Sequence, residues 1–228
     1  MMMTIEAKGL RKDFPRARTS STTFTAVKAL DLTIGAGTLT VVNGRSGSGK
    51  STLLNMLAGL LTPTSGTVTL DGTDVYSLDD AELARLRNRS VGLVPQGHTA
   101  LRALTVLENV LLPAILYPSD DREDFAERAR ELLDDVGIAD LADASPNELS
   151  GGELRRMAIA RALLMTPGIV LADEPTAGLD EHNATAVLGL LRAAADAGAA
   201  VLVVTHEADA AGYADRVMTM DAGALTGA

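Results

Sequence analysis

The sequence contains Gly44-Arg45-Ser46-Gly47-Ser48-Gly49-Lys50-Ser51, which matches the pattern G-x-x-x-x-G-K-[ST]. Glycines in such a loop allow successive backbone N–H groups to point into one concavity, because no Cβ restricts φ and ψ. An apolar run, Leu39–Val42, precedes the loop as a predicted strand, and an apolar-periodic helix through Leu53–Leu60 follows it. That context disfavours a Gly-rich surface turn that matches by chance. The loop therefore predicts a site for nucleotide phosphates, in which Lys50 contacts the β- and γ-phosphates and Ser51 ligates Mg²⁺.

The composition limits the class of protein. The chain has 228 residues, 46% of them hydrophobic, which suffices for a core near the upper size of one α/β domain. With 30 acidic and 20 basic side chains the net charge is −10, which argues against non-specific nucleic-acid binding. The absence of Cys excludes disulfides and thiolate metal sites. No run of 18 apolar residues and no signal-peptide pattern occur, so we expect a soluble, cytoplasmic protein.

Apolar runs alternate with helical patterns, which is typical of a parallel sheet covered on both faces. Strands are predicted at Thr4–Leu10, Val27–Ile34, Thr38–Val42, Thr67–Leu70, Ser90–Val94, Ile169–Ala172 and Ala200–Val204. Further helices are predicted at Glu153–Met165 and Asn183–Ala195, and residues 104–143 have a helical pattern. We therefore expect an α/β nucleotide-binding core with an antiparallel β edge near the N-terminus and a helical insertion.

Two carboxylates, Asp173 and Glu174, follow the apolar strand Ile169–Ala172. In open α/β sheets, ligands bind at this carboxyl edge of the strands. Asp173 could hold Mg²⁺, and Glu174 could orient and deprotonate a water that attacks the γ-phosphate. The alternative is a plain acidic turn ended by Pro175. The neighbouring phosphate loop favours the functional interpretation.

A second Gly-rich turn, Leu149-Ser150-Gly151-Gly152-Glu153, opens a predicted helix. A helix N-terminus can bind an anion, but on its own the turn is better explained by Ser150 acting as a simple N-cap. Two phosphate-binding helix starts in one chain leave two possibilities. The chain binds two ligands, or each turn serves the same nucleotide from opposite subunits.

Two further polar residues follow predicted strands. His206 comes after Ala200–Val204 and is a candidate group for polarising or sensing the γ-phosphate. Gln96 comes after Ser90–Val94, where its amide oxygen could reach Mg²⁺ or the attacking water. A polar loop residue is the simpler explanation of Gln96 when no other motif is considered.

In this order, the motifs resemble those of an ATP-binding cassette (ABC) ATPase over almost the whole chain, from Ile5 to about Gly223. The resemblance implies a P-loop NTPase (RecA-like) core with an N-terminal antiparallel β subdomain and an inserted α-helical subdomain. The chain would form a single ABC ATPase domain, 1–228, with its core at about 1–95 and 155–228 and its helical lobe at about 97–154. It also implies a head-to-tail homodimer on ATP binding, in which ATP lies between the phosphate loop of one subunit and Ser150-Gly151-Gly152 of the other.

The resemblance implies a role for each matching residue. Phe14 would stack on adenine, with Phe24 a weaker candidate, and Glu174 would be the catalytic base. Phosphate and Mg²⁺ would be bound by the loop from Gly44 to Ser51 together with Thr52, Gln96 and Asp173. Gln96 would also link the nucleotide site to a membrane partner, and His206 would be the switch histidine. ATP bound to one subunit would be contacted across the dimer by Ser150, Gly151, Gly152 and Glu153 of the other. Asp180, in the Gly178-Leu179-Asp180 loop, would couple the two subunits across the dimer interface.

Details of the sequence indicate a subgroup of the family. A long loop between Phe14 and Val27 and the run Thr105–Pro113 resemble ATPases of the macrolide-export and lipoprotein-release type. The resemblance implies that a separate integral membrane permease is the partner and that the chain lies on the cytoplasmic face of the membrane. The net charge of −10 predicts that no nucleic acid is bound. The permease would dock near Gln96 and the helical lobe, and ATP-driven dimer closure would drive motion of its extracytoplasmic part.

Two alternatives stay open within the family. One is a regulatory ABC ATPase that controls a cell-envelope partner and transports nothing. The other, a soluble ABC ATPase acting on DNA or ribosomes, is disfavoured by the single cassette and the net charge of −10. Departures from the family pattern at Pro95, Gly178 and Glu153-Leu154-Arg155-Arg156 are expected to affect dimer closure or permease contacts.

Overall fold

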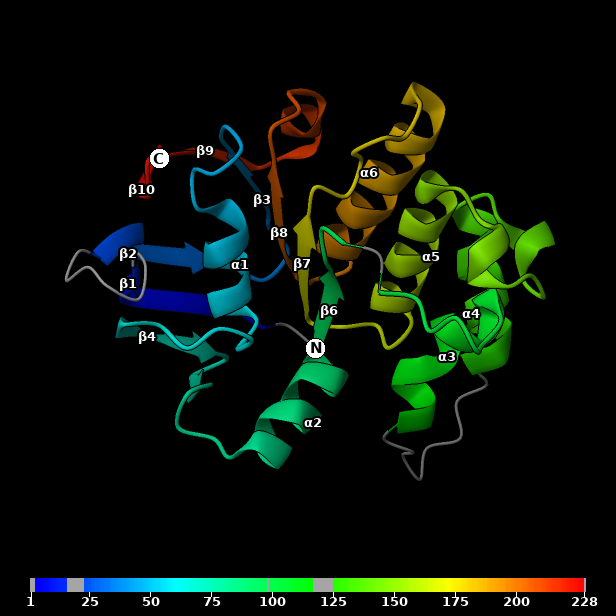
Figure 1. Ribbon diagram of the computed structural model, residues 1–228, viewed down its shortest axis with the longest axis horizontal. Coiled ribbons are helices and arrows are strands. Elements are labelled where there is room, and N and C mark those ends of the chain that lie inside the picture. Colours follow the sequence, from blue (N-terminus) through cyan, green and yellow to red (C-terminus); the bar gives the residue numbers. More distant parts are fainter. Residues whose placement is uncertain (1–2, 16–22, 98, 117–124, 228) are drawn as a thin grey trace.

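The computed structural model in Figure 1 describes residues 3–15, 23–97, 99–116 and 125–227. The central part of the loop between Phe14 and Val27, on which the subgroup expectation partly rested, lies outside these residues. So do 117–124 of the predicted helical segment. Within the described ranges, no helix has the length and apolarity needed to cross a membrane.

The larger sheet carries the phosphate loop and has six strands in the order β10-β9-β3-β8-β7-β6 (Figure 1). Its strands are β3 (Leu39–Asn43), β6 (Val91–Val94), β7 (Ile169–Asp173), β8 (Ala200–Thr205), β9 (Arg216–Asp221) and β10 (Ala224–Thr226). Strands β9 to β6 pair in parallel, and β10 pairs antiparallel at the edge. The predicted parallel sheet is therefore confirmed.

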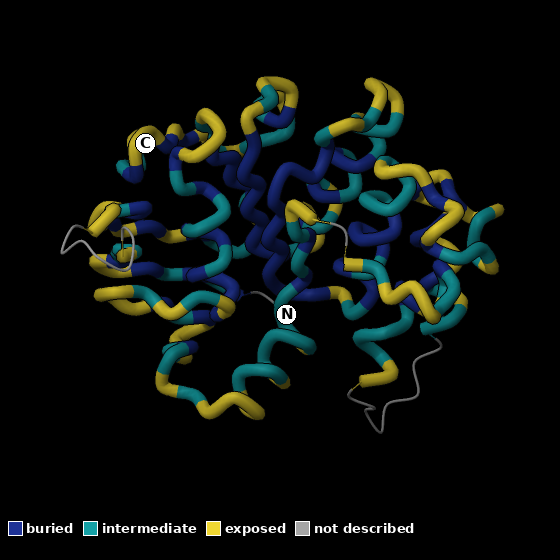
Figure 2. The backbone as a smooth tube through the Cα atoms, viewed as in Figure 1, coloured by how far each residue is buried: buried dark blue, intermediate teal, exposed yellow. Residues whose placement is uncertain are grey.

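Both faces of this sheet are buried because alternate residues of its strands enter different cores. Val41, Val170 and Val203 pack in the core that includes α5 (Gly151–Leu163) and α6 (Glu181–Asp196), whereas their neighbours Val42 and Leu171 face the core that includes α1 (Lys50–Leu57). Figure 2 shows the strands as a continuous buried layer between the helices. Each such side chain contributes about 1.5–3 kcal/mol on full burial. The phosphate loop is therefore anchored in the most buried part of the chain.

The antiparallel sheet has the order β2-β1-β4-β5 and packs against the other side of α1 (Figure 1). Its strands are β1 (Ile5–Pro15), β2 (Thr23–Ile34), β4 (Ser65–Leu70) and β5 (Thr73–Asp74). The first strand continues five residues beyond its predicted end at Leu10, because register shifts between Ala7 and Asp13 let β1 bend and remain paired with β2. This extension places Phe14 opposite Phe24.

The helical segment contains α3 (Val106–Leu116), α4 (Phe125–Asp135) and two short 3₁₀ turns, η1 (Ala139–Leu141) and η2 (Pro146–Glu148). The fully buried Asn109 holds the preceding turn on α3, since its Oδ1 accepts from the Leu101 N–H at 2.7 Å and its Nδ2 donates to the Thr105 carbonyl at 2.8 Å. Helix α5 packs against α3, α4 and also β6. It runs without a break through residues 154 and 155, and so joins the helical segment to the larger sheet.

Sequence patterns missed α2 (Asp80–Ser90), η3 (Asp209–Tyr213) and the edge strands β9 and β10. Helix α2 has no fully buried residue, and its apolar pattern is weak because only Leu83 and Leu86 pack partly against the core. Its start is nevertheless encoded locally, because the Asp79 side chain accepts from the Glu82 N–H at 2.8 Å and Glu82 accepts from the Asp79 N–H at 3.1 Å.

Alanine at Gly92 is expected to destabilise the fold. A Cβ there would lie 2.4 Å from the Ala162 carbonyl oxygen, and backbone atoms of a packed helix cannot easily move aside. Overpacking of this kind costs about 1–3 kcal/mol, which lowers Tm by roughly 2–12 °C in a chain of this size. Thermal unfolding monitored by circular dichroism measures the change. The matched control is Gly189→Ala in α6, where the Cβ meets open space and helix propensity predicts equal or higher stability. Equal melting of the two variants would contradict the prediction.

Candidate nucleotide site

The phosphate loop connects the end of β3 at Asn43 to the start of α1 at Lys50. Gly49 precedes the helix with φ 109°, in the region that favours glycine. A Cβ on Gly49 would also lie 2.3 Å from the Ala26 carbonyl oxygen of β2. The glycine is therefore required both by the turn and by the close approach of the antiparallel sheet.

The Lys50 side chain lies inside the loop and is only 5% exposed. Its Nζ donates to the carbonyl oxygens of Gly44 at 2.5 Å and Arg45 at 3.2 Å, and lies 3.8 Å from Glu174 Oε1. A buried ammonium needs such partners, because an unpaired charge in a low-dielectric site is costly. The loop thus holds one fixed positive charge next to a carboxylate.

Glu174 directly follows β7 and adopts φ 51°, which is uncommon for a residue other than glycine. Its Oε2 accepts hydrogen bonds from the Thr205 hydroxyl at 2.9 Å and the His206 N–H at 3.2 Å, and lies 2.9 Å from His206 Nδ1. Burial alone would raise the pKa of Glu174, but the hydrogen bonds from His206 and Thr205 outweigh it and lower the pKa below its usual range. The same contact raises the pKa of His206. The structure thus brings Lys50, Glu174 and His206 together.

Asp173, the last residue of β7, is buried, and its Oδ1 has no hydrogen-bond partner within the described ranges. Burial raises the pKa of this carboxyl, and a hydrogen bond from the Ser51 hydroxyl opposes the shift. A buried acceptor without a partner is uncommon in folded proteins. Carboxylate and hydroxyl oxygens are hard ligands of the kind that Mg²⁺ takes, so Asp173 and Ser51 fit such an ion.

A cavity of about 270 Å³ opens beside the loop. Candidate site residues from five separate segments meet in this cavity. Its lining is Phe14, Phe24, Ala26, Ser46, Gly47, Gly49, Lys50, Ser51, Thr52, Gln96 and Glu174. Gly44, Arg45 and Ser48 lie in the same loop outside this lining, and Asp173 and His206 adjoin it beside Glu174. Both aromatic candidates reach the cavity, since Phe14 and Phe24 pair across β1 and β2.

The second Gly-rich turn starts α5, and Ser150 is its N-cap. The Ser150 hydroxyl accepts from the Glu153 N–H at 3.3 Å, and the Glu153 carboxylate accepts from the Ser150 N–H at 2.7 Å. This capping box turns Glu153 away from the adjacent cavity of about 420 Å³, whose lining includes Ser150, Gly151, Gly152 and Asp180. Ser150 is therefore the N-cap of α5, and the loop with Asp180 lies beside it.

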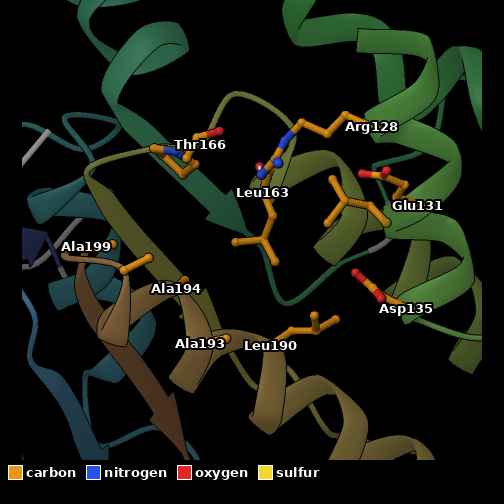
Figure 3. Close-up of a pocket in the computed structure, with 12 residues that line it drawn as sticks. Arg128, Glu131, Asp135, Leu163, Thr166, Leu190, Ala193, Ala194 and Ala199 are labelled. Atoms are coloured by element: carbon orange, nitrogen blue, oxygen red, sulfur yellow. Dashed lines mark hydrogen bonds between the residues drawn. The ribbon is translucent and has the colours of Figure 1, made fainter. Parts of the chain in front are cut away.

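A third cavity, of about 250 Å³, lies among α4, the end of α5 and α6 (Figure 3). Its lining includes Arg128 and Glu131 of α4 and Leu190 of α6. Ala199, which also lines it, directly precedes β8, and Thr166 lies three residues before the start of β7. The cavity is thus at the amino ends of these strands, away from the phosphate loop, and contains none of the predicted site residues.

Residue patterns assigned neither Thr205 nor Arg155 to the nucleotide site. Thr205 donates to Glu174 Oε2 and accepts from the Glu207 N–H at 3.0 Å. Its position directly before His206 at the end of an apolar strand was a usable signal. Arg155 contacts the main chain of Glu174 and Gln96, which lie 19 and 59 residues away in the sequence. No local pattern indicates a contact between such distant segments.

Comparison with known proteins agrees with this geometry. The family model described as ABC transporter matches residues 27–177. The lipoprotein-releasing system ATP-binding protein LolD of Anaeromyxobacter dehalogenans is 43% identical over 95% of this chain and 90% of its own length. The macrolide export ATP-binding/permease protein MacB of Rhodopseudomonas palustris is 43% identical over 97% of this chain, which spans about a third (33%) of that longer protein. These relatives confirm the resemblance to the lipoprotein-release and macrolide-export subgroup.

Solved structures show the same architecture. The dimeric structure of MJ0796, described as a bacterial ABC transporter cassette, has a TM-score of 0.90 and is 35% identical, with 98% of each chain covered. A dimeric post-hydrolysis state of the same cassette, bound to ADP and Pi, has the same TM-score of 0.90. The predicted fold, an α/β P-loop core with an antiparallel β subdomain and inserted helices, is confirmed. From the loop, the acid pair at the end of β7 and these likenesses together, the chain belongs to the ABC transporter family as an ATP-binding cassette.

Proposed function

We propose that this chain is the ATP-binding and ATP-hydrolysing subunit of an ABC transporter and powers a separate membrane permease. The observation that carries the proposal is the Glu174 carboxylate, held between Lys50 and His206 at the mouth of the phosphate loop. The subgroup follows from relatives named for lipoprotein release and macrolide export. An export or mechanotransmission type of permease is therefore the partner we favour.

The residues that line the cavity beside the loop offer contacts both for the adenine ring and for the phosphates of ATP. The rings of Phe14 and Phe24 supply apolar area for adenine at one side, and Lys12 Nζ lies 5.2 Å from the Phe14 ring centroid. The loop amides and the N-terminus of α1, with Ser51 and Thr52, are arranged to receive the phosphates. Lys50 would exchange its carbonyl partners for phosphate oxygens, which are stronger, charge-assisted acceptors.

Asp173, Ser51 and Gln96 are the residues we assign to Mg²⁺. The unpartnered Asp173 Oδ1 and the Ser51 hydroxyl bonded to this carboxyl supply oxygen ligands, and Gln96 reaches the same cavity. When bound, such an ion neutralises charge that develops on the phosphates.

Glu174 is assigned as the general base for the attacking water. Its lowered pKa keeps the carboxylate ionised at neutral pH, as an acceptor of a proton must be. Thr205 and His206 fix the direction of the carboxylate by holding the single oxygen Oε2, which leaves Oε1 toward Lys50 and the cavity. His206 would contact the γ-phosphate from the same side.

A head-to-tail homodimer would complete the site. The N–H groups of Gly151 and Gly152 belong to the first turn of α5, where no preceding helical carbonyl is available to accept from them. Both glycines line a cavity together with Asp180. These groups would bind the γ-phosphate held by the phosphate loop of the second copy. We propose that the whole of 1–228 acts as one cassette, with core segments at about 1–95 and 155–228 and a lobe at about 97–154, on the cytoplasmic face of the membrane.

Affinity purification of the Glu174→Gln protein from detergent-solubilised native membranes with MgATP tests the proposal. We expect recovery of a permease with few membrane spans and a large extracytoplasmic domain. A compact, many-span permease would reassign the chain to a conventional transporter subgroup, and a cell-envelope regulator would favour the non-transport alternative. Recovery of nucleic acid or ribosomes without any membrane protein would contradict the transporter assignment.

A further inference from the structure

Arg155, in the second turn of α5, contacts the main chain of two loops that carry proposed site residues. Its Nη1 donates a hydrogen bond to the carbonyl oxygen of Glu174, and its Nη2 donates to the carbonyl oxygen of Gln96 at 3.5 Å. Glu174 and Gln96 follow β7 and β6, which are neighbours in the sheet. One guanidinium therefore joins the helix capped by Ser150 to both loops.

The chemistry of arginine suits this position. A guanidinium carries five N–H donors in one rigid plane and keeps its charge at any physiological pH, so it can donate to two carbonyls from different segments at once. Arg155 Nε is buried and has no hydrogen-bond partner among the described residues, although the residue as a whole is half-buried. Lysine, with a single nitrogen, cannot reproduce this fork.

Both polar main-chain atoms of Glu174, and one oxygen of its carboxylate, make hydrogen bonds. Its N–H donates to the Val204 carbonyl at 2.8 Å, and its carbonyl oxygen accepts from Arg155 and, at 3.3 Å, from the Ala177 N–H. Its carboxylate accepts from Thr205 and His206. With φ at 51°, the residue adopts a conformation that persists only where the surroundings impose it. Without the Arg155 bond, this carbonyl would keep only the local bond from Ala177, three residues away, so the peptide could shift and move the carboxylate with it.

We propose that Arg155 is a positioning residue, which fixes the direction of the Glu174 carboxylate by holding its main chain and makes that direction depend on the position of α5. Because α5 packs against α3 and α4 as well as β6, a shift of the helical segment reaches the base through this side chain. The inference rests on the proposed ATPase function. It also gives the unusual Glu153-Leu154-Arg155-Arg156 run a role within one subunit.

A competing explanation is that Arg155 binds ATP across the dimer. Arg155 lines the cavity that contains Ser150, Gly151 and Asp180, which is assigned to the nucleotide of the second copy. The two explanations differ in what Arg155 changes. A positioning residue affects the rate of hydrolysis, whereas a contact to ATP in trans affects formation of the ATP-bound dimer.

The test is steady-state ATP hydrolysis by Arg155→Met and Arg155→Lys, together with equilibrium ATP binding. We expect Met to lower kcat about 10- to 100-fold, as misplacement of a reacting group does, while KM and the Kd for ATP stay unchanged. Lys, which retains one charged donor, should recover part of the loss. The exposed Arg85 of α2 provides the matched control, and Arg85→Met should hydrolyse ATP like wild type.

A second measurement uses the Glu174→Gln background. There, Arg155→Met should leave the MgATP-driven dimer seen by size-exclusion chromatography unchanged. Loss of this dimer, or a wild-type kcat for Arg155→Met, would overturn the inference; if Met prevents folding, the Lys variant is judged by the same two criteria. A wild-type chain that hydrolyses no ATP would instead overturn the proposed function, while an inactive Glu174→Gln protein beside a fully active Arg155→Met protein overturns this inference alone.

Discussion

Replacing Glu174 by Gln is expected to lower ATP turnover by about 10²- to 10⁴-fold, the range of a lost general base, while ATP binding persists. The amide has the same shape as the carboxylate, so its oxygen can still accept from the Thr205 hydroxyl and the His206 N–H. In the wild-type chain these two groups donate to Glu174 Oε2 at 2.9 and 3.2 Å. Removal of the negative charge also removes its repulsion of the γ-phosphate. A dimer that binds ATP but does not hydrolyse it should therefore accumulate.

Two assays separate these effects. Phosphate release measures turnover, and size-exclusion chromatography with MgATP measures the dimer. The exposed Glu131 of α4, away from the loop, gives the matched control Glu131→Gln, which should hydrolyse ATP at the wild-type rate. Turnover by the Glu174→Gln variant near the wild-type rate would refute Glu174 as the base.

Replacing Lys50 by Met should weaken ATP binding by about 10- to 100-fold and reduce hydrolysis at least as much. The variant lacks the ammonium that would donate hydrogen bonds to the phosphates, and a hydrogen bond to a charged group is worth about 1.5–3 kcal/mol. Lys50 is 5% exposed and lies 3.8 Å from Glu174 Oε1, so the variant also leaves this carboxylate without its nearby cation. Methionine fills much of the same volume, and the apolar part of the site should persist.

Isothermal titration with MgATP measures the affinity directly, and thermal unfolding without nucleotide shows whether the fold survives. The exposed Lys28 of β2 provides a charge-matched control, Lys28→Met, for which ATP affinity should be unaltered. If the Lys50→Met variant bound MgATP as tightly as wild type, the assignment of Lys50 to the phosphates would be wrong.

Local sequence was sufficient for the elements that depend on neighbouring residues. The phosphate loop is contiguous, and its strand-to-helix context is visible as the apolar run before Gly44 and the periodic helix after Lys50. The strand before Asp173 was predictable because a short, wholly apolar run favours a strand that is buried on both faces. Helix α2 was missed, since it buries no residue fully and its clearest local signal is the Asp79 and Glu82 capping pair.

Tertiary structure was needed wherever side chains from different strands meet. The sequence by itself determined that a phosphate loop, an acid pair and a Gly-rich helix start exist in one α/β chain, because each is encoded by adjacent residues. Only the strand order, with β8 between β3 and β7, places Thr205 and His206 against Glu174, 31 and 32 residues away in sequence. The hydrogen bond from Arg155 to the Glu174 carbonyl likewise depends on tertiary structure, because it joins helix α5 to the end of β7. Contacts of this kind depend on how distant segments pack, and packing is a property of the whole core rather than of any local run of residues.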